Sequence, residues 1–94
     1  MEESQKIFRY EIRFFGQVQG VGFRYTAYHA ASREGATGWV HNEWDGTVLM
    51  QIQGTLAQIS KVVKTIEERI FFGIDRIEKT AIEVEKQEGC FSVR

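Results

Sequence analysis

The chain contains no proline and only one cysteine in its 94 residues. The single cysteine, Cys90, cannot form a disulfide within the chain and leaves no Cys-x-x-Cys pair to bind a metal. Neither sign of charge is in excess, because 12 Lys and Arg residues stand against 13 Asp and Glu residues, for a formal net charge of −1. No broad basic surface is therefore expected to attract nucleic acid.

Long hydrophobic runs are also lacking. No charged-then-apolar leader opens the sequence, and no apolar run approaches the roughly 20 residues of a membrane-spanning helix. We therefore expect no membrane partner and a reducing, cytoplasmic setting. With 43% hydrophobic and 27% charged residues, the composition is that of an ordinary globular protein. The length predicts one small domain over residues 1–94, with polar residues 1–6 frayed.

Glycine is concentrated in one stretch, residues 16–24, which read GQVQGVGFR. Glycines let the backbone turn tightly and approach a ligand closely. Successive amides of such a turn can form a nest for an anion, and a helix that follows adds its unpaired N–H groups. Arg24 falls in the first helical turn, where a bound dianion would remove the conflict between its charge and the helix dipole. The stretch is a candidate phosphate site; the alternative is a plain turn before a helix, with Arg24 in solvent.

Periodicity and turn signals predict the order of helices and strands. Apolar and charged residues alternate from Ile7 onward, which is typical of a half-buried strand. Asp45-Gly46 between two apolar runs marks a hairpin, and Thr55 with Gln58 has the spacing of a capping box. Trp39 is expected in the core. The expected elements are strand 7–14, helix 22–34 ended by Gly35, strands 37–42 and 47–54, and helix 55–70 with its apolar stripe starting at Leu56. A fourth strand is expected within residues 76–86, where Ile82 and Val84 alternate with glutamates, and a short strand 90–94 with Phe91 and Val93 inward.

The order strand–helix–strand–strand–helix–strand predicts an α+β fold, the ferredoxin-like plait (βαββαβ), with an antiparallel sheet and two helices on one face. Right-handed crossovers would place the first and third strands side by side in the sheet centre. Many unrelated activities share this fold, so it decides no function.

Two stretches resemble motifs of the acylphosphatase family. Residues 16–24 resemble the family signature, and residues 38–42 (GWVHN) with Asp45-Gly46 resemble its second motif at the expected distance downstream. The resemblance implies the ferredoxin-like plait and a small free-standing enzyme. It also implies hydrolysis of the carboxyl–phosphate bond of acyl phosphates, with no metal and no cofactor.

The resemblance also implies roles for individual residues. By position, Arg24 would bind the phosphate and Asn42 would orient the attacking water. The backbone of Gln19, Gly20, Val21, Gly22 and Phe23 would cradle the phosphoryl oxygens. The expected partners are a small acyl phosphate as substrate and inorganic phosphate as product and inhibitor. A monomer is expected.

Two other functions remain open for this sequence. One is a non-catalytic module that binds phosphate or a phospho-ligand in the same cradle, although a pure binder would not require Asn42. The other is an RNA-binding plait with Phe8 and Tyr10 stacking on bases. Phe8 and Tyr10 share one face of the strand with Ile12, which places these aromatics under the helices instead, and the sequence has no excess of basic residues to attract RNA. His41 stands where the family often has arginine, and strand alternation predicts that it faces away from Asn42 into solvent.

Overall fold

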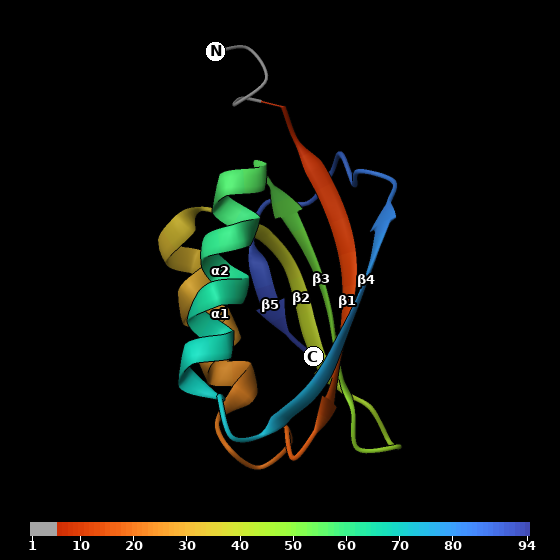
Figure 1. Cartoon of the computed structure of the whole chain (residues 1–94). Coiled ribbons are helices and arrows are strands. Elements are labelled where there is room, and N and C mark those ends of the chain that lie inside the picture. The colour runs from red at the N-terminus through yellow and green to blue at the C-terminus, as the bar shows by residue number, and fades with distance from the viewer. Residues whose placement is uncertain (1–5) are drawn as a thin grey trace.

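In the computed structural model, which describes residues 6–94, two helices cover one face of a five-stranded sheet (Figure 1). The elements are β1 (Phe8–Gly16), α1 (Phe23–Glu34), β2 (Thr37–Asn42), β3 (Val48–Gly54), α2 (Leu56–Arg69), β4 (Ile74–Ile82) and β5 (Phe91–Val93). The first six elements follow the βαββαβ order, with both helices on the same face, which confirms the predicted ferredoxin-like plait, and β5 adds a short fifth strand. The expected fraying of residues 1–6 falls, apart from Lys6, outside the described residues.

The strands lie in the order β4-β1-β3-β2-β5. β1 pairs antiparallel with β3, from Phe8 opposite Gly54 to Phe14 opposite Val48, so the predicted neighbours are confirmed. The prediction of a wholly antiparallel sheet is wrong for one pair, because β5 runs parallel to β2. The chain reverses direction after β4 and crosses to the other edge of the sheet, and the reversed direction is that of β2.

The fourth strand, predicted to lie within residues 76–86 and to include Val84, begins earlier, at Ile74, and ends at Ile82. β4 pairs with β1 from Gly16 opposite Ile74 to Arg9 opposite Ile82, and β1 extends only one residue beyond Arg9. Residues 83–86 therefore have no strand to pair with, although Val84 alternates with glutamates as a strand residue would. In β5, Phe91 is buried as predicted, but Val93 is 47% exposed at the sheet edge.

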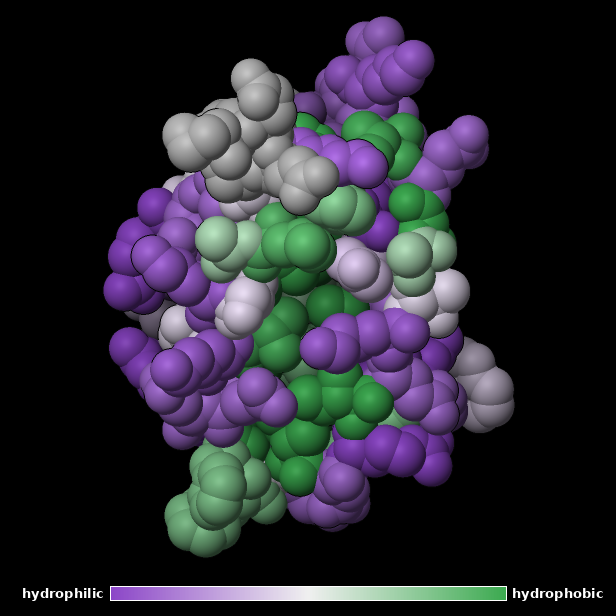
Figure 2. Space-filling view, turned by 45° about the horizontal axis from the view of Figure 1, so that its top comes forward, coloured by the Kyte–Doolittle hydropathy of each residue, from purple (hydrophilic) through white to green (hydrophobic). Residues whose placement is uncertain are grey.

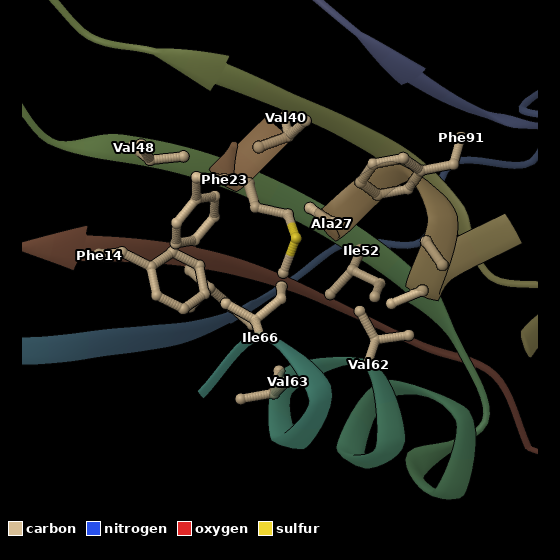
Figure 3. Close-up of a cluster of buried hydrophobic side chains, with 14 of the residues drawn as sticks. Phe14, Phe23, Ala27, Val40, Val48, Ile52, Val62, Val63, Ile66 and Phe91 are labelled. Carbon is tan, nitrogen blue, oxygen red and sulfur yellow. The ribbon is translucent and has the colours of Figure 1, made fainter. Parts of the chain in front are cut away.

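The core lies between the sheet and the helices (Figure 3). The Phe14 ring in β1 meets the Phe23 ring edge-on, with centroids 4.7 Å apart, which fixes the start of α1 against the sheet. The small residues of α1 let this helix pack closely against the sheet, and α2 contributes a stripe of branched aliphatic residues to the core. Leu56, expected in that stripe, is half exposed, and Val62 is buried instead. The buried residues of the two helices are Phe23, Ala27, Ala30, Ala31, Ile59, Val62, Val63 and Ile66.

Trp39 does not join the core. Along β2 the buried residues are Gly38 and Val40, so Trp39 projects from the opposite face, where it is half-buried. The guanidinium of Arg94 lies over its ring, 4.7 Å from the centroid. Both aromatic and cation gain from this contact, since the ring face carries negative potential.

A hollow of about 600 Å³ lies between α2 and the sheet, with Tyr10, Ile59, Val63 and Lys79 among its lining residues. Figure 2 shows a strip of hydrophobic residues between hydrophilic flanks on this side of the molecule. The hollow contains none of the predicted site residues. Within residues 6–94, no helix combines the length and apolar character that crossing a membrane requires.

Candidate active site

A smaller cavity, of about 210 Å³, lies where the turn after β1, the start of α1 and the end of β2 meet. It brings Arg24 and Asn42 together, which stand 18 positions apart in the sequence. Its remaining walls are Val18, Gly20, Gly22, Phe23 and Tyr25. Of the residues predicted for the site, Gln19 and Val21 are not among the lining residues, and Val21 is half exposed.

Glycine is required in this turn by backbone conformation. Gly20 and Gly22 have φ angles of 77° and 78°, in the left-handed region where a side chain is strained. A Cβ at either position would meet no atom within 4 Å, so the space outside both residues is open. The backbone of the turn is therefore bare where it borders the cavity.

The start of α1 has neither a side-chain cap nor a negative charge to balance its N–H groups. Its N-cap is Gly22, which has no side chain to accept the first amides, and the first turn contains no acidic residue. The N-terminal N–H groups of a helix carry partial positive charge and lack partners within the helix. An anion in the cavity would supply acceptors for these donors.

Arg24 extends from the first turn of α1 to the C-terminal end of the described chain. Its Nη1 donates a hydrogen bond to the backbone oxygen of Arg94, at 3.3 Å. Arg94 is itself held by its backbone N–H, which donates to the carbonyl of Val40 at 2.8 Å. The contact holds one side of the Arg24 guanidinium and leaves other donors of the planar fork for a ligand.

Asn42 ends β2 on the core side of the sheet, in register with Val48. Its Oδ1 atom is buried and accepts no hydrogen bond from residues 6–94. Unpaired buried acceptors are rare and are costly to a fold. This atom is therefore suited to accept a hydrogen bond from a group that enters the cavity.

Gln19 points away from the cavity toward the hairpin between β2 and β3. Its Nε2 atom donates to the backbone oxygens of Glu43, at 2.6 Å, and of Thr47, at 2.9 Å. The turn is also held on its other side, where the N–H of Gln17 donates to the carbonyl of Gly73 at 2.8 Å. The sequence motif predicts a role only for the backbone of Gln19 and contains no signal of these side-chain bonds.

The hairpin that receives Gln19 is itself tightly bonded. Asp45 accepts from the backbone N–H and the hydroxyl of Thr47, at 3.0 and 2.7 Å. These bonds hold the pKa of the Asp45 carboxyl below its ordinary value. Arg13 donates to the same hydroxyl at 2.8 Å. His41 is exposed, as predicted, with its Nε2 atom 3.6 Å from a carboxylate oxygen of Glu43.

Comparison with known proteins assigns the family. The sequence model of the acylphosphatase family matches residues 10–93. The chain belongs to the acylphosphatase family. The predicted resemblance, first based on two short motifs, is thereby confirmed over nearly the whole chain.

Curated acylphosphatases resemble the chain to different extents. It is 47% identical to the acylphosphatase of Geobacillus kaustophilus over 57 residues, which is 61% of each chain. The match to the acylphosphatase of Ligilactobacillus salivarius is 40% identical over 86 residues and covers 89% of this chain and 94% of that one. The first of these matches thus spans less than two thirds of the relative's length, and the second spans most of it.

Solved structures of the acylphosphatase family share the fold. The crystal structure of the acylphosphatase from Bacillus subtilis matches with a TM-score of 0.82 and 28% identity, covering 93% of this chain and 98% of that chain. Residues 6–94 hold no group of three or more His, Cys, Asp and Glu residues arranged to bind a metal ion. The independence from metals that the family resemblance implies stays a prediction.

Proposed function

We propose that the chain is an acylphosphatase, which hydrolyses acyl phosphates to a carboxylate and inorganic phosphate. The observation that carries the proposal is one cavity shared by the Arg24 guanidinium, the open start of α1 and the unpartnered Oδ1 atom of Asn42. The first two offer donors to a phosphate, and the third offers an acceptor to a water.

Phosphate binding would use Arg24 and the backbone from Gln19 to Phe23. The arginine fork can donate two parallel hydrogen bonds to two phosphate oxygens, which a lysine cannot do. The amides of the turn and of the first turn of α1 are already fixed by the fold. Donors that need little reorganisation stabilise the charge that develops during phosphoryl transfer.

Water attack would be directed by Asn42. Its Oδ1 atom would accept a hydrogen bond from one O–H group of the water, so that a lone pair of the water oxygen faces the phosphorus. The bond between the water oxygen and phosphorus forms as the bond between phosphorus and the acyl oxygen breaks. The electron pair of the broken bond leaves with the carboxylate. The water proton passes to a phosphate oxygen. A carboxylate is a weak base, with a pKa near about 4, so the leaving group needs no protein acid.

Asparagine suits this position better than aspartate. A neutral amide can hold the water without repelling a phosphate dianion, and it does not change charge with pH. The transition state of phosphoryl transfer is loose and depends on position and charge more than on proton transfer. A titrating base is therefore unnecessary.

We also propose a reducing, cytoplasmic compartment and a monomeric state. The lone cysteine, Cys90, supports the first because it is an exposed thiol without a disulfide partner in the chain. Exposed charged residues on α2, among them Lys64, Glu67 and Glu68, support the second, since charged residues are depleted from the buried centres of protein interfaces.

The test is hydrolysis of benzoyl phosphate with chelator present, by wild type, Arg24→Ala and Arg33→Ala. Arg33 is the control because it is an exposed arginine in the last turn of the same helix. We expect turnover by wild type and Arg33→Ala, nearly complete loss in Arg24→Ala, and weaker inhibition by inorganic phosphate in that variant. If folded wild type binds phosphate without turnover, the chain is a binding module; a strict need for metal would overturn the mechanism.

A further inference from the structure

The side chain of Gln19 joins the two halves of the candidate active site. Gln19 immediately precedes Gly20 of the cavity wall, and Glu43, one of its two acceptors, immediately follows Asn42. Both N–H groups of one amide are used, at 2.6 Å to Glu43 and 2.9 Å to Thr47. The link thus starts at the first residue of the proposed backbone cradle and ends one residue from Asn42.

The two acceptors of Gln19 belong to the closing pair of the hairpin. The N–H of Glu43 donates to the carbonyl of Thr47 at 2.8 Å, and Gly46 donates to the carbonyl of Glu43 at 3.1 Å. The Gln19 amide therefore bonds to the base of the hairpin, just beyond the end of β2. A movement of the turn after β1 would stretch bonds to the same backbone that positions Asn42.

We propose that Gln19 is a positioning residue, whose side chain fixes the distance between the phosphate cradle and Asn42. This role rests on the proposed function, because it concerns how the attacking water is aligned with the bound phosphoryl group. Arg24, the backbone of the turn and the start of α1 hold the phosphate without the side chain of Gln19. Removing its side-chain bonds therefore lowers kcat more than it weakens phosphate binding.

Only a side chain with suitable donors can make this link. A glutamate has the same shape as glutamine but presents oxygen to two carbonyl oxygens, so the link becomes a repulsion at neutral pH. A methionine is similar in length and presents no donor. A protonated glutamate again has one O–H to donate. Gln19→Glu should thus behave worse than Gln19→Met at neutral pH and recover in acid.

The test compares kcat for benzoyl phosphate and the inhibition constant of inorganic phosphate in wild type, Gln19→Met, Gln19→Glu and Gln17→Glu. Gln17 is the control because it lies in the same turn with an exposed side chain outside the cavity. A misplacement of about 1 Å can cost about 100-fold in rate. We expect kcat to fall by about 10- to 100-fold in both Gln19 variants, with the inhibition constant changed less than about threefold and Gln17→Glu near wild type.

Two further readouts separate positioning from a general loss of structure. The ratio of kcat in Gln19→Glu to kcat in Gln19→Met should rise as the pH falls toward about 4, where a carboxyl becomes protonated. In a double-mutant cycle, Gln19→Met should cost much less in an Asn42→Ala background, because the residue it positions is already missing.

A measurement on the wild type needs no variant to fold. The side-chain amide protons of Gln19 should exchange with solvent more slowly than those of Gln17, as seen by NMR. Equal exchange would overturn the link. So would wild-type kcat in the Gln19 variants, equal losses in kcat and phosphate binding, or full additivity with Asn42→Ala. An inactive wild type would instead contradict the proposed function and leave the exchange result to decide the link.

Discussion

Asn42 shows at the scale of single residues how the site joins stability to chemistry. Its Oδ1 atom is the one buried side-chain polar atom without a hydrogen-bond partner among the residues described. Replacing Asn42 by alanine removes the acceptor that would hold the water but leaves Arg24 and the backbone donors in place. We expect kcat to fall, with the activation free energy of the reaction raised by about 2–4 kcal/mol, and KM to change less.

Steady-state kinetics with benzoyl phosphate would measure this loss, and His41→Ala, from the exposed face of the same strand, is the matched control. Equal weakening of phosphate inhibition in Asn42→Ala would make Asn42 a binding residue and not one that orients water.

A second residue-scale feature is the buried arginine on the open face of the sheet. Arg9 is only 4% exposed, and its Nη1 atom lies 2.7 Å from a carboxylate oxygen of Glu88. Its Nη2 atom donates to the other carboxylate oxygen of Glu88 at 3.2 Å, and Gln51 and Gln53 accept its remaining hydrogen bonds. The group ties the segment after β4 to the sheet and explains why Glu88 is half-buried.

Glu88 should make the stability of the protein depend on pH. Burial favours its neutral form, but hydrogen bonds from Arg9 and Thr37 and the positive charges of Arg9 and Arg94 outweigh this and lower the pKa of Glu88. A carboxyl with a lowered pKa in the folded state stabilises the fold above its unfolded pKa, and the contribution is lost as the pH falls through the folded pKa.

We therefore expect the unfolding free energy of wild type to drop between about pH 5 and pH 3 by more than that of Glu88→Gln. Urea unfolding at several pH values would measure both curves. Glu78→Gln is the control, because Glu78 is exposed and pairs with Arg76, which is also exposed. Parallel curves for wild type and Glu88→Gln would show that the buried pair carries no pH dependence.

At the scale of elements, a single glycine sets how closely two strands approach. Gly38 in β2 has a φ angle of 137°, and a Cβ there would lie 1.9 Å from the carbonyl oxygen of Gln51 in β3. Gly46, at the hairpin tip, has a φ angle of 95° but open space around it. We expect Gly38→Ala to lower the unfolding free energy by more than about 3 kcal/mol, since backbone strain adds to a steric overlap.

Gly46→Ala carries only the conformational strain and should cost about 1–2 kcal/mol. Chemical denaturation of the two variants gives the comparison. Similar losses would mean that β2 can shift away from β3 without penalty.

Elements whose signals are local could be predicted from the sequence. The capping box of α2 is one, since Thr55 and Gln58 exchange both expected hydrogen bonds, at 2.9 and 3.1 Å. The bounds of β4 could not be predicted, because the length of β1 and not the alternation near Val84 decides where pairing ends. The same holds at the site. Arg24 and Asn42 follow from motifs, whereas the bonds of Gln19 reach backbone 24 and 28 positions away.

At the scale of the whole molecule, ligand binding and folding are linked. A ligand that binds only the folded chain stabilises it, by about 2.7 kcal/mol when its concentration is 100 times its Kd. If inorganic phosphate occupies the cavity, it should raise Tm by about 10 °C or more at such a concentration. Thermal unfolding with added phosphate measures the shift, with equal ionic strength from chloride as the control.

The shift in Tm should largely vanish in Arg24→Ala and persist in Arg33→Ala. A shift that is equal in all three proteins would mean that phosphate acts on the surface as a stabilising salt and not in the cavity.

The unpartnered Oδ1 atom of Asn42 has a consequence for laboratory evolution. A buried acceptor without a donor lowers the stability of the resting protein, and strained or unsatisfied groups at active sites are a recurrent source of trade-offs between stability and activity. A screen that rewards heat resistance alone would therefore favour apolar residues at this position, since valine fits a strand and needs no donor. Selection for more heat-stable variants must also measure turnover in the same round, or the stable variants that are selected will lack activity.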